Sequence, residues 1–349
     1  MVTTVIKPIE FVQRDPRADA LVVTNMWPES SRPVYGIFVE RQVEFLRQAG
    51  LRIDVLYVRG YISKMIYLRA ALLFLWLSIS RRRRYRFVHV HGGEMALVAR
   101  VFRIKPMVAT YHGDDVLGYK SDDGPISRGS RLRSLIIRHH AALFDATVTQ
   151  SKEMHDRLPQ HVQRHNRVIH CGVDVERFAP MDRGEARRQL GWDDAERVVL
   201  FAATKPYEPR KRIDLAEAAV KQAEGDLGPI RFAIAENLPL DSIPIMMNAA
   251  DCLLMTSMNE GGPLVVKEAV LCALPVVATD VGDVRKVLDG VSPSAICGHD
   301  AHELGTALVD VLKANRRSDG RDQRAELDQS TTVKQLLDLY NDLGIRVSS

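Results

Sequence analysis

The chain has 349 residues, and 48 Lys and Arg against 44 Asp and Glu give it a formal net charge of +4 at pH 7. Hydrophobic residues make up 46% and charged residues 26%, a balance that excludes the disordered and fibrous classes. The chain exceeds one typical domain of ~100–200 residues, so two domains are expected. The mildly basic charge favours phosphate-bearing partners or an anionic membrane surface and does not require nucleic acid.

The cysteines and the first residues concern the compartment in which the protein works. Cys171, Cys252, Cys272 and Cys297 lie far apart with no Cys-x-x-Cys pair, so the sequence predicts neither a zinc ribbon nor a disulfide framework. Residues Met1–Arg17 lack the continuous apolar core and the small-residue cleavage site of a signal peptide. We therefore expect a cytoplasmic protein.

The first half of the sequence alternates short β-rich runs with helical stretches, which is typical of a parallel α/β sheet. Phe38, Val43 and Leu46 fall near helical spacing before Gly50, so residues 36–49 are predicted to form the first crossover helix. The strands are predicted to be buried on both faces, because most of them carry no charge. They are Ala20–Thr24, Arg52–Val58, Phe87–Val90, Met107–Thr110 and Ala146–Thr149.

An unusually apolar run lies between the second and third of these strands. Ala70–Leu77 reads AALLFLWL and is followed after three residues by Arg81–Arg84, and it is too short to span a bilayer of ~30 Å. On a helix Leu75 and Trp76 point away from Leu77, so the run is apolar nearly all round, whereas a crossover helix needs one apolar stripe. Two interpretations stay open, namely docking on an anionic membrane and burial under another helix.

The second half begins after residues 172–180, which read GVDVERFAP and whose glycine and proline mark a connection between domains. The α/β pattern then starts again, so the predicted fold class is α/β, with two Rossmann-like doubly wound domains facing a cleft. The predicted strands are Val198–Ala202, Arg231–Ile234, Cys252–Met255 and Pro275–Ala278, and the helices lie around Asp214–Ala223, Ile243–Ala250 and Pro263–Leu274.

The end of the chain is predicted to form a closing helix, because Val333, Leu336, Leu337 and Tyr340 fall at helical spacing. We expect the domains to cover residues 1–169 and 170–330. Residues 331–349 are expected to pack back toward the first domain.

The sharpest motif reads NEGGPLVVKEA and begins at residue 259. Glu260 would follow a strand, Gly261 and Gly262 turn the chain, and Pro263 opens a helix that carries Glu268 ~7 Å further along. Free N–H groups at such a helix start bind anions. Two carboxylates that flank an anion site suit a sugar nucleotide. The structural alternative is that one glutamate caps the helix and the other is solvated on its surface.

The Glu-x7-Glu spacing resembles the signature of the retaining family-4 glycosyltransferases, which have the GT-B fold. Other stretches resemble a bacterial surface-polysaccharide branch of that family, and together they cover nearly the whole chain in the expected order. They are Gly36–Val39 with Gln42, Tyr111–Asp114, Gly172–Asp174 with Phe178, and Asp251–Asp283. The resemblance implies a metal-independent transferase without a cofactor.

By that resemblance, Glu260 and His112 are the catalytic candidates, both next to the transferred sugar. Glu268 holds the ribose hydroxyls, and ionised carboxylates do accept strong hydrogen bonds from hydroxyls. Gly36 lies on the acceptor or phosphate side. The residues that offer backbone groups to the sugar and the phosphates are Gly261, Gly262, Leu264 and Val265.

Lys205 and Lys211 match the two basic positions with which the family binds the diphosphate. The usual Gly-Arg is replaced here by AATK at residues 202–205, and a lysine supplies a point charge without bidentate geometry. The alternative for residues 210–212, RKR, is a solvated turn. With lysines and helix N–H groups on the diphosphate no cation is required, so the acidic pairs 114–115, 122–123 and 193–194 are not assigned to a metal. His89 and His91 have no third ligand nearby in the sequence.

The resemblance thus implies that a sugar moves with retention from a nucleoside-diphosphate sugar, bound by the second domain, to a saccharide acceptor entering from the first. A polyprenyl-linked acceptor in cell-surface polysaccharide synthesis, at the inner face of the cell membrane, would fit. Two alternatives stay open. A nucleotide-sugar 2-epimerase would need no acceptor, and a noncatalytic partner protein would not need His112, Lys211, Glu260 and Glu268 together.

Overall fold

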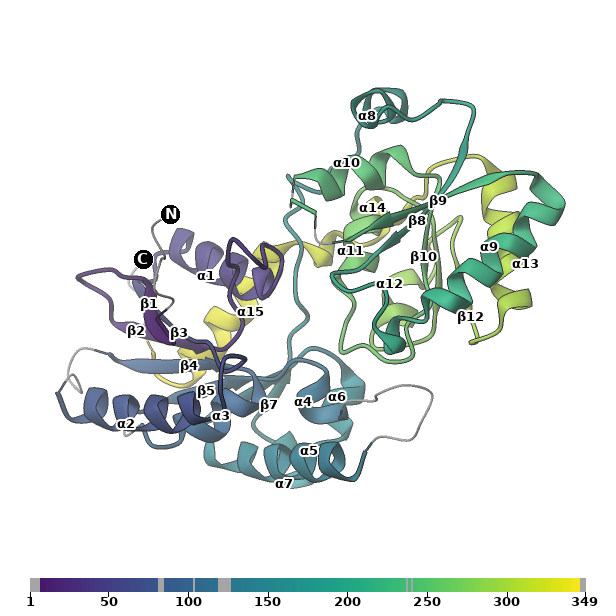
Figure 1. Cartoon of the computed structure of the whole chain (residues 1–349). Coiled ribbons are helices and arrows are strands. Elements are labelled where there is room, and N and C mark those ends of the chain that lie inside the picture. Colours follow the sequence, from purple (N-terminus) through teal and green to yellow (C-terminus); the bar gives the residue numbers. More distant parts are fainter. Residues whose placement is uncertain are drawn as a thin grey trace, which may run out of the picture.

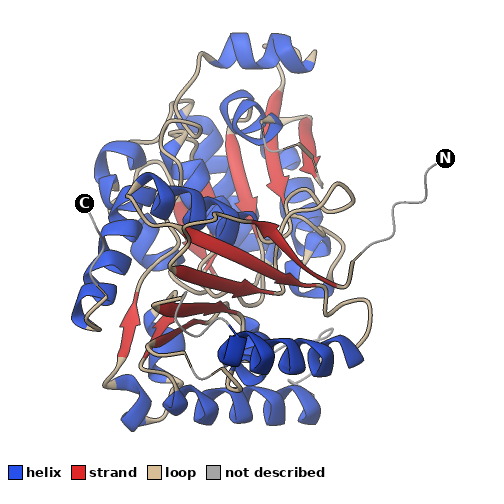
Figure 2. Ribbon diagram, turned by 90° about the vertical axis from the view of Figure 1, so that its left-hand side faces the viewer, coloured by secondary structure: helices blue, strands red, loops and turns tan. Residues whose placement is uncertain are grey.

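The computed structural model of the chain describes residues 7–80, 85–102, 104–118, 127–236, 238–239 and 241–345. It contains two α/β domains, each with a central sheet between helices (Figures 1 and 2). The arginine run Arg81–Arg84 and the acidic pair 122–123 lie outside the described residues.

The first sheet has seven strands within the described part of the chain, in the order β1-β3-β2-β4-β5-β6-β7. Neighbouring strands run parallel except β1 and β3, which are antiparallel with Ile9 opposite Val58. The sequence analysis did not predict β1, and this strand runs antiparallel because the short link from β1 to β2 has no room for the crossover that a parallel strand needs. The strands are β1 (Ile9–Gln13), β2 (Ala20–Thr24), β3 (Ile53–Val58), β4 (Phe87–His91), β5 (Met107–Thr110), β6 (Ala146–Thr149) and β7 (Asn166–Val168).

Helices cover both faces of this sheet (Figure 2). They are α1 (Ile37–Gln48), α2 (Met65–Ser80), α3 (Gly93–Ala99), α4 (Asp114–Leu117), α5 (Arg128–His140), α6 (Lys152–Asp156), α7 (Gln160–Gln163) and the chain-terminal α15 (Gln329–Asp342). The predicted crossover helix over residues 36–49 is α1, and Gly36 just before it has a φ of 75°. A Cβ at Gly36 would lie 2.3 Å from the backbone of Met26, so glycine lets α1 start against the carboxyl end of β2.

The second sheet is parallel throughout its described strands, in the order β12-β11-β10-β8-β9. Its strands are β8 (Arg197–Ala202), β9 (Ile230–Ala235), β10 (Cys252–Met255), β11 (Val276–Thr279) and β12 (Ala295–Cys297). Its helices are α8 (Arg183–Leu190), α9 (Ile213–Leu227), α10 (Ser242–Ala249), α11 (Leu264–Leu271), α12 (Val284–Leu288), α13 (Ala301–Ala314) and α14 (Gly320–Gln323). The α/β class and the pair of Rossmann-like domains predicted from the sequence are confirmed.

The predicted closing helix is α15, which returns from the second domain to pack on α1 (Figure 1). Val333, Leu336 and Tyr340 join the apolar core between the first sheet and α1. The Tyr340 hydroxyl lies 2.6 Å from Nδ1 of His89, whose Nε2 is 2.7 Å from the hydroxyl of Thr110. His89 therefore has structural partners on both ring nitrogens. The border between the domains at residue 169 stays a prediction.

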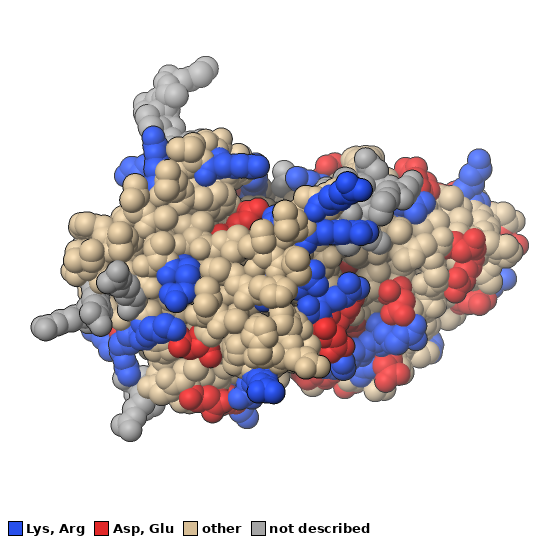
Figure 3. All heavy atoms as spheres, turned by 90° about the horizontal axis from the view of Figure 1, so that it is seen from below, with Lys and Arg blue, Asp and Glu red and all other residues tan. Residues whose placement is uncertain are grey.

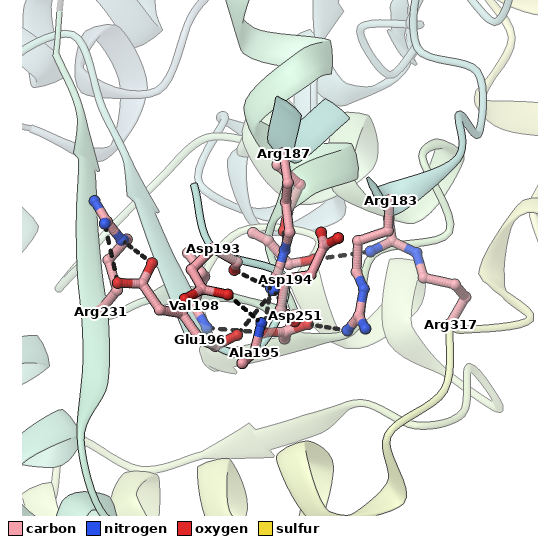
Figure 4. Close-up of polar contacts among 12 residues, drawn as sticks. Arg183, Arg187, Asp193, Asp194, Ala195, Glu196, Val198, Arg231, Asp251 and Arg317 are labelled. Atoms are coloured by element: carbon pink, nitrogen blue, oxygen red, sulfur yellow. Dashed lines mark hydrogen bonds and ion pairs between the residues drawn. The ribbon is translucent and has the colours of Figure 1, made fainter. Parts of the chain in front are cut away.

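A buried arginine fixes the amino end of the second sheet, away from the edge where the strands' carboxyl ends lie. The Arg187 side chain is fully buried, and Figure 4 shows it between α8 and the start of β8. It pairs with Asp251 at 2.9 Å, and Asp251 also accepts from the Val198 amide at 2.7 Å. Arg187 further donates to the backbone oxygens of Asp193, Asp194, Glu196 and Ala249. Because nearly all its donors have partners, this charge is structural.

The apolar run is part of α2, whose exposed side is as apolar as its buried side. Phe74 and Leu77 face the core, whereas Leu72 is 63%, Trp76 54% and Ile79 74% exposed. Helix α5 lies on the same underside of the first domain (Figure 1) and also exposes large apolar side chains. We call this surface the α2–α5 face. Its members are Met65, Leu68, Leu72, Leu75, Trp76 and Ile79 of α2, and Leu132, Leu135 and Ile136 of α5.

The sequence left open whether the apolar run of α2 is buried under another helix. Large apolar side chains of α2 stay exposed within the described structure, so no described helix buries them. Figure 3, seen from below, shows broad areas without charged residues, with Lys and Arg and also some Asp and Glu around them. None of the described helices is both long and apolar enough to cross a membrane.

Candidate active site

The loop after β10 and the start of α11 form the centre of the candidate site. Pro263 precedes the first residue of α11, Leu264, so the backbone N–H groups of the first turn have no partner within the helix. The predicted strand–turn–helix arrangement of the NEGGP motif is confirmed. Glu260 stands in the loop before the helix, and Glu268 lies in its second turn. Both carboxylates are only 14% exposed.

Glu260 is surrounded by cations from the loop after β8. Its Oε1 lies 2.6 Å from Nζ of Lys211 and 3.1 Å from Nη1 of Arg210. Burial on its own would raise the pKa of Glu260, but Lys211 and Arg210 outweigh it and the pKa falls below the ordinary value. Glu260 is therefore held ionised.

The two loops are also joined through their backbones. The Met258 amide donates to the Arg210 carbonyl at 2.8 Å, and the Thr256 hydroxyl donates to the carbonyls of Lys211 and Arg212. The positions of the cations relative to Glu260 thus follow from hydrogen bonds between the ends of β8 and β10. The carboxyl ends of parallel strands share one edge, where α/β folds place ligands.

Glu268 has a different environment, because its cation comes from the other domain. Nη1 of Arg41 on α1 lies 3.4 Å from Oε1 of Glu268. Burial raises the pKa of Glu268, and Arg41 offsets this only in part. The pKa values of the two carboxylates in this motif are therefore shifted in opposite directions.

Lys205 is a predicted site residue whose side chain is more exposed than that of Lys211. It follows β8, as expected, but its side chain is exposed, whereas Lys211 is partly buried and pairs with Glu260. The solvated-turn alternative for residues 210–212 does not fit Arg210 and Lys211, since both are partly buried on Glu260.

His112 follows β5 at the edge of the first sheet that faces α11. Its Nδ1 lies 2.5 Å from Nε2 of Gln150, and its Nε2 lies 3.3 Å from Nδ1 of His91. Burial lowers the pKa of His112, with the neighbouring His91 adding to the effect, so the imidazole is neutral. A donor sugar would have to replace one of these ring contacts or meet the adjacent backbone.

The two domains touch at a pair of glycines, one in each predicted motif. A Cβ at Gly261 would lie 2.8 Å from the backbone of Gly113, a distance that real contacts do not reach. Gly113 itself has a φ of 46°, which glycine adopts most readily. The absence of side chains at these two positions thus brings His112 next to the loop of Glu260.

A buried ion cluster lies beneath the same loop. Nζ of Lys267, which is fully buried, lies 2.7 Å from Oδ2 of Asp283, and that oxygen is 3.0 Å from Nδ1 of His170. Burial opposes ionisation of Asp283, but Lys267 and the hydrogen bond from His170 lower its pKa below the ordinary value. A Cβ at Gly262 would lie 3.3 Å from the Asp283 carboxylate. The cluster therefore connects the loop to the segment that joins the domains.

Sequence reasoning missed several side chains at the site. Arg41, Arg210, Gln150, Lys267 and Asp283 all contact predicted site residues or each other. Arg210 stood next to Lys211, so its position after a strand was a usable signal. The others become neighbours only through contacts between distant segments. Among the residues that the structure describes, no group of three or more His, Cys, Asp or Glu is placed to hold a metal ion.

Comparison with known families agrees with this geometry. Residues 19–177 match the family model described as Glycosyltransferase Family 4, and residues 215–314 match the model described as Glycosyl transferases group 1. The two models cover the first domain and much of the second, in the order expected from the sequence.

Solved structures give the fold. Sucrose-phosphate synthase from Thermosynechococcus elongatus superposes with a TM-score of 0.76 at 18% identity, covering 93% of this chain and 99% of that one. The Anabaena protein HepE in complex with UDP and glucose gives a TM-score of 0.68 at 16% identity and the same coverage. The fold is that of the GT-B glycosyltransferases. Together with the family models, it supports a transferase of the family-4 type.

Curated relatives match over parts of their length. The D-inositol 3-phosphate glycosyltransferase of Salinispora tropica is 31% identical over 313 residues, which are 74% of this chain and 64% of that protein. The Mycobacterium marinum protein of the same name is 33% identical over 180 residues, which are 44% of this chain and 38% of that protein. The chain thus spans less than two thirds of these relatives.

The contact between the two glycines gives a test of the domain arrangement. Gly261→Ala would place a methyl group against the Gly113 backbone, so the domains should move apart and the radius of gyration in small-angle scattering should rise. Gly225→Ala is the control, because a Cβ there meets no heavy atom within 4 Å, and in helix α9 it should stabilise by ~0.5–1 kcal/mol. Equal scattering of both variants would contradict the close approach.

Proposed function

We propose that the chain transfers a sugar from a nucleoside-diphosphate sugar to a saccharide acceptor with retention of the anomeric configuration. The observation that carries this proposal is the pair of buried carboxylates, Glu260 and Glu268, on either side of the free N–H groups at the start of α11. Such a helix start binds phosphate, and the carboxylates suit hydroxyls at both ends of the donor. The GT-B fold supports the same reaction class.

In this proposal each part of the donor meets a different group. Glu268 accepts hydrogen bonds from the ribose hydroxyls, and Glu260 from hydroxyls of the transferred sugar. Lys211, Arg210 and the exposed Lys205 supply positive charge to the diphosphate, with backbone groups of Gly261, Gly262, Leu264 and Val265 beside it. The base is uracil or guanine. UDP in the HepE complexes makes uracil the first candidate to test.

In the proposed chemical step, Glu260 positions the sugar and does not act as a nucleophile. The bond from the anomeric carbon to the diphosphate breaks while the acceptor oxygen bonds to that carbon on the same face. The acceptor's proton passes to the departing phosphate oxygen, so no protein nucleophile is needed. Glu260, already held by Lys211 and Arg210, positions the sugar, and His112 borders it from the first domain.

We propose a polyprenyl-linked saccharide of cell-surface polysaccharide synthesis as the acceptor. The curated relatives are named for D-inositol 3-phosphate, a small phosphate-bearing molecule. Here the α2–α5 face supports a lipid-linked acceptor instead, because it would hold the first domain, and Gly36 with it, at the cytoplasmic side of a membrane. In helices α2 and α5 no Asp or Glu interrupts this face.

The charge of the α2–α5 face fits anionic lipid. Lys64, Arg69, Arg128 and Arg131 are exposed on or next to these helices. Apolar side chains that enter the interface and basic side chains at the headgroups are the two components of peripheral binding. The proposed enzyme is thus cytoplasmic and associates with the inner face of the cell membrane.

Substitution of Glu260 and of Glu268 should affect nucleotide affinity and turnover differently. Glu268→Gln removes the charge that strengthens its bonds to ribose and should weaken nucleoside diphosphate binding about 10- to 100-fold, from ~1.5–3 kcal/mol for a charge-assisted bond. Glu260→Gln should leave that affinity unchanged or slightly tighter, because Lys211 and Arg210 are released, while turnover with the whole donor falls. Calorimetry with UDP and GDP checks both. An equal loss in the two variants would show that the roles are wrongly assigned.

The reaction should not depend on a divalent cation, because the cations after β8 and the start of α11 supply the positive field. Assays of sugar transfer with excess chelator should give nearly the native rate. Recovery of a lost rate on adding magnesium or manganese would overturn this account of diphosphate binding.

Membrane adsorption should depend on the α2–α5 face. The double variant Leu72→Ser, Trp76→Ser should lower binding to anionic liposomes about tenfold or more, since each side chain contributes up to ~1.5–3 kcal/mol when buried. The control is Tyr207→Ser, which removes a 66% exposed ring from the second domain. Flotation should also weaken as salt rises. Equal flotation of the double variant and the control would refute the assignment.

A further inference from the structure

Arg41 is a first-domain residue whose guanidinium is enclosed by the second domain. It lies on α1 and is only 5% exposed. Its Cζ lies 5.4 Å from the ring centre of Phe178, and its Nη1 lies 3.4 Å from Glu268 on α11. The charge is therefore buried beside the carboxylate assigned to the donor's ribose.

The guanidinium is not satisfied by these contacts. Its Nε and Nη2 are buried and have no hydrogen-bond partner among the described residues. The single bond to Glu268 is longer than the ~2.7–2.9 Å of a strong charge-assisted hydrogen bond. A buried cation ordinarily has partners for nearly all its donors, as Arg187 has in the same chain, so the open donors of Arg41 point to a ligand.

The open donors define the ligand's chemistry. Nε and Nη2 form one edge of the planar guanidinium, and two parallel N–H groups on such an edge match two oxygens of a phosphate or carboxylate. Nη1 on the other side is turned to Glu268. An anion bound to this free edge would lie next to the nucleotide's ribose.

We propose that Arg41 binds the diphosphate of the nucleotide donor, so that the donor site is completed by a residue of the first domain. This inference rests on the proposed function, in which Glu268 holds the ribose of the same nucleotide. It differs from the family's assignment, which places both diphosphate cations in the second domain. One ligand would then engage both α1 and α11.

A competing interpretation makes the opposite prediction. If Arg41 only occupies Glu268 in the empty site, removing it frees the carboxylate and the nucleotide binds more tightly. If Arg41 contacts phosphate, removing it weakens binding. The sign of the change therefore separates a ligand contact from a blocking contact.

The experiment measures UDP and GDP binding by phosphorus NMR titration, which also detects weak complexes. Arg41→Met should weaken the nucleoside diphosphate that the native protein binds by about 10- to 100-fold. Arg41→Lys keeps the charge but loses the two-donor edge and should weaken it by about tenfold, even if the methionine variant does not fold. The control is Arg167→Met, which removes an exposed charge of the first domain paired with Asp342.

A double-mutant cycle with Glu268→Gln separates contact from positioning. A direct phosphate contact keeps the loss caused by Arg41→Met in the Glu268→Gln background, whereas a role in orienting Glu268 makes that loss vanish. Unchanged or tighter binding by Arg41→Met and Arg41→Lys would also overturn the inference while the proposed function stands. A native protein that binds neither nucleotide would overturn the proposed function itself.

Discussion

The charge balance around the start of α11 is the constraint on which the site depends. Glu260 and Glu268 are both buried, and a buried carboxylate stays ionised only when cations and hydrogen bonds replace water. Lys211 and Arg210 come from the loop after β8, and Arg41 comes from the other domain. The motif is thus electrostatically complete only when three segments that are remote in the sequence have folded together.

The same constraint makes the two carboxylates chemically distinct. Two close cations lower the pKa of Glu260, so this group is a permanent hydrogen-bond acceptor whose own charge is largely balanced. Burial raises the pKa of Glu268, because the guanidinium groups of Arg41 and Arg177 offset it only in part. In the proposed function, ribose hydroxyls would donate further hydrogen bonds to Glu268.

The arrangement of the domains serves this site. Gly113 and Gly261 permit a close backbone approach between the two domains, while Lys267 and Asp283 link the loop of Glu260 to His170 in the connection between the domains. Helix α15 returns to the first domain, so the chain crosses between the domains twice. On the underside of the first domain, the α2–α5 face leaves apolar side chains in solvent that a purely structural helix would have no reason to expose.

The sequence by itself determined the class of fold and the main motif, because both depend on short-range pattern. Uncharged runs such as Met107–Thr110 and Cys252–Met255 became fully buried strands, and the order strand, glycine pair, proline and helix fixed where Glu260 and Glu268 stand. The antiparallel strand β1 was not predicted, because it pairs with β3 at the edge of the sheet and short-range pattern does not report that pairing. Only the tertiary structure decided which cations meet the carboxylates. Arg41 lies 227 residues from Glu268, and no periodicity or spacing reports a contact formed by the meeting of two domains.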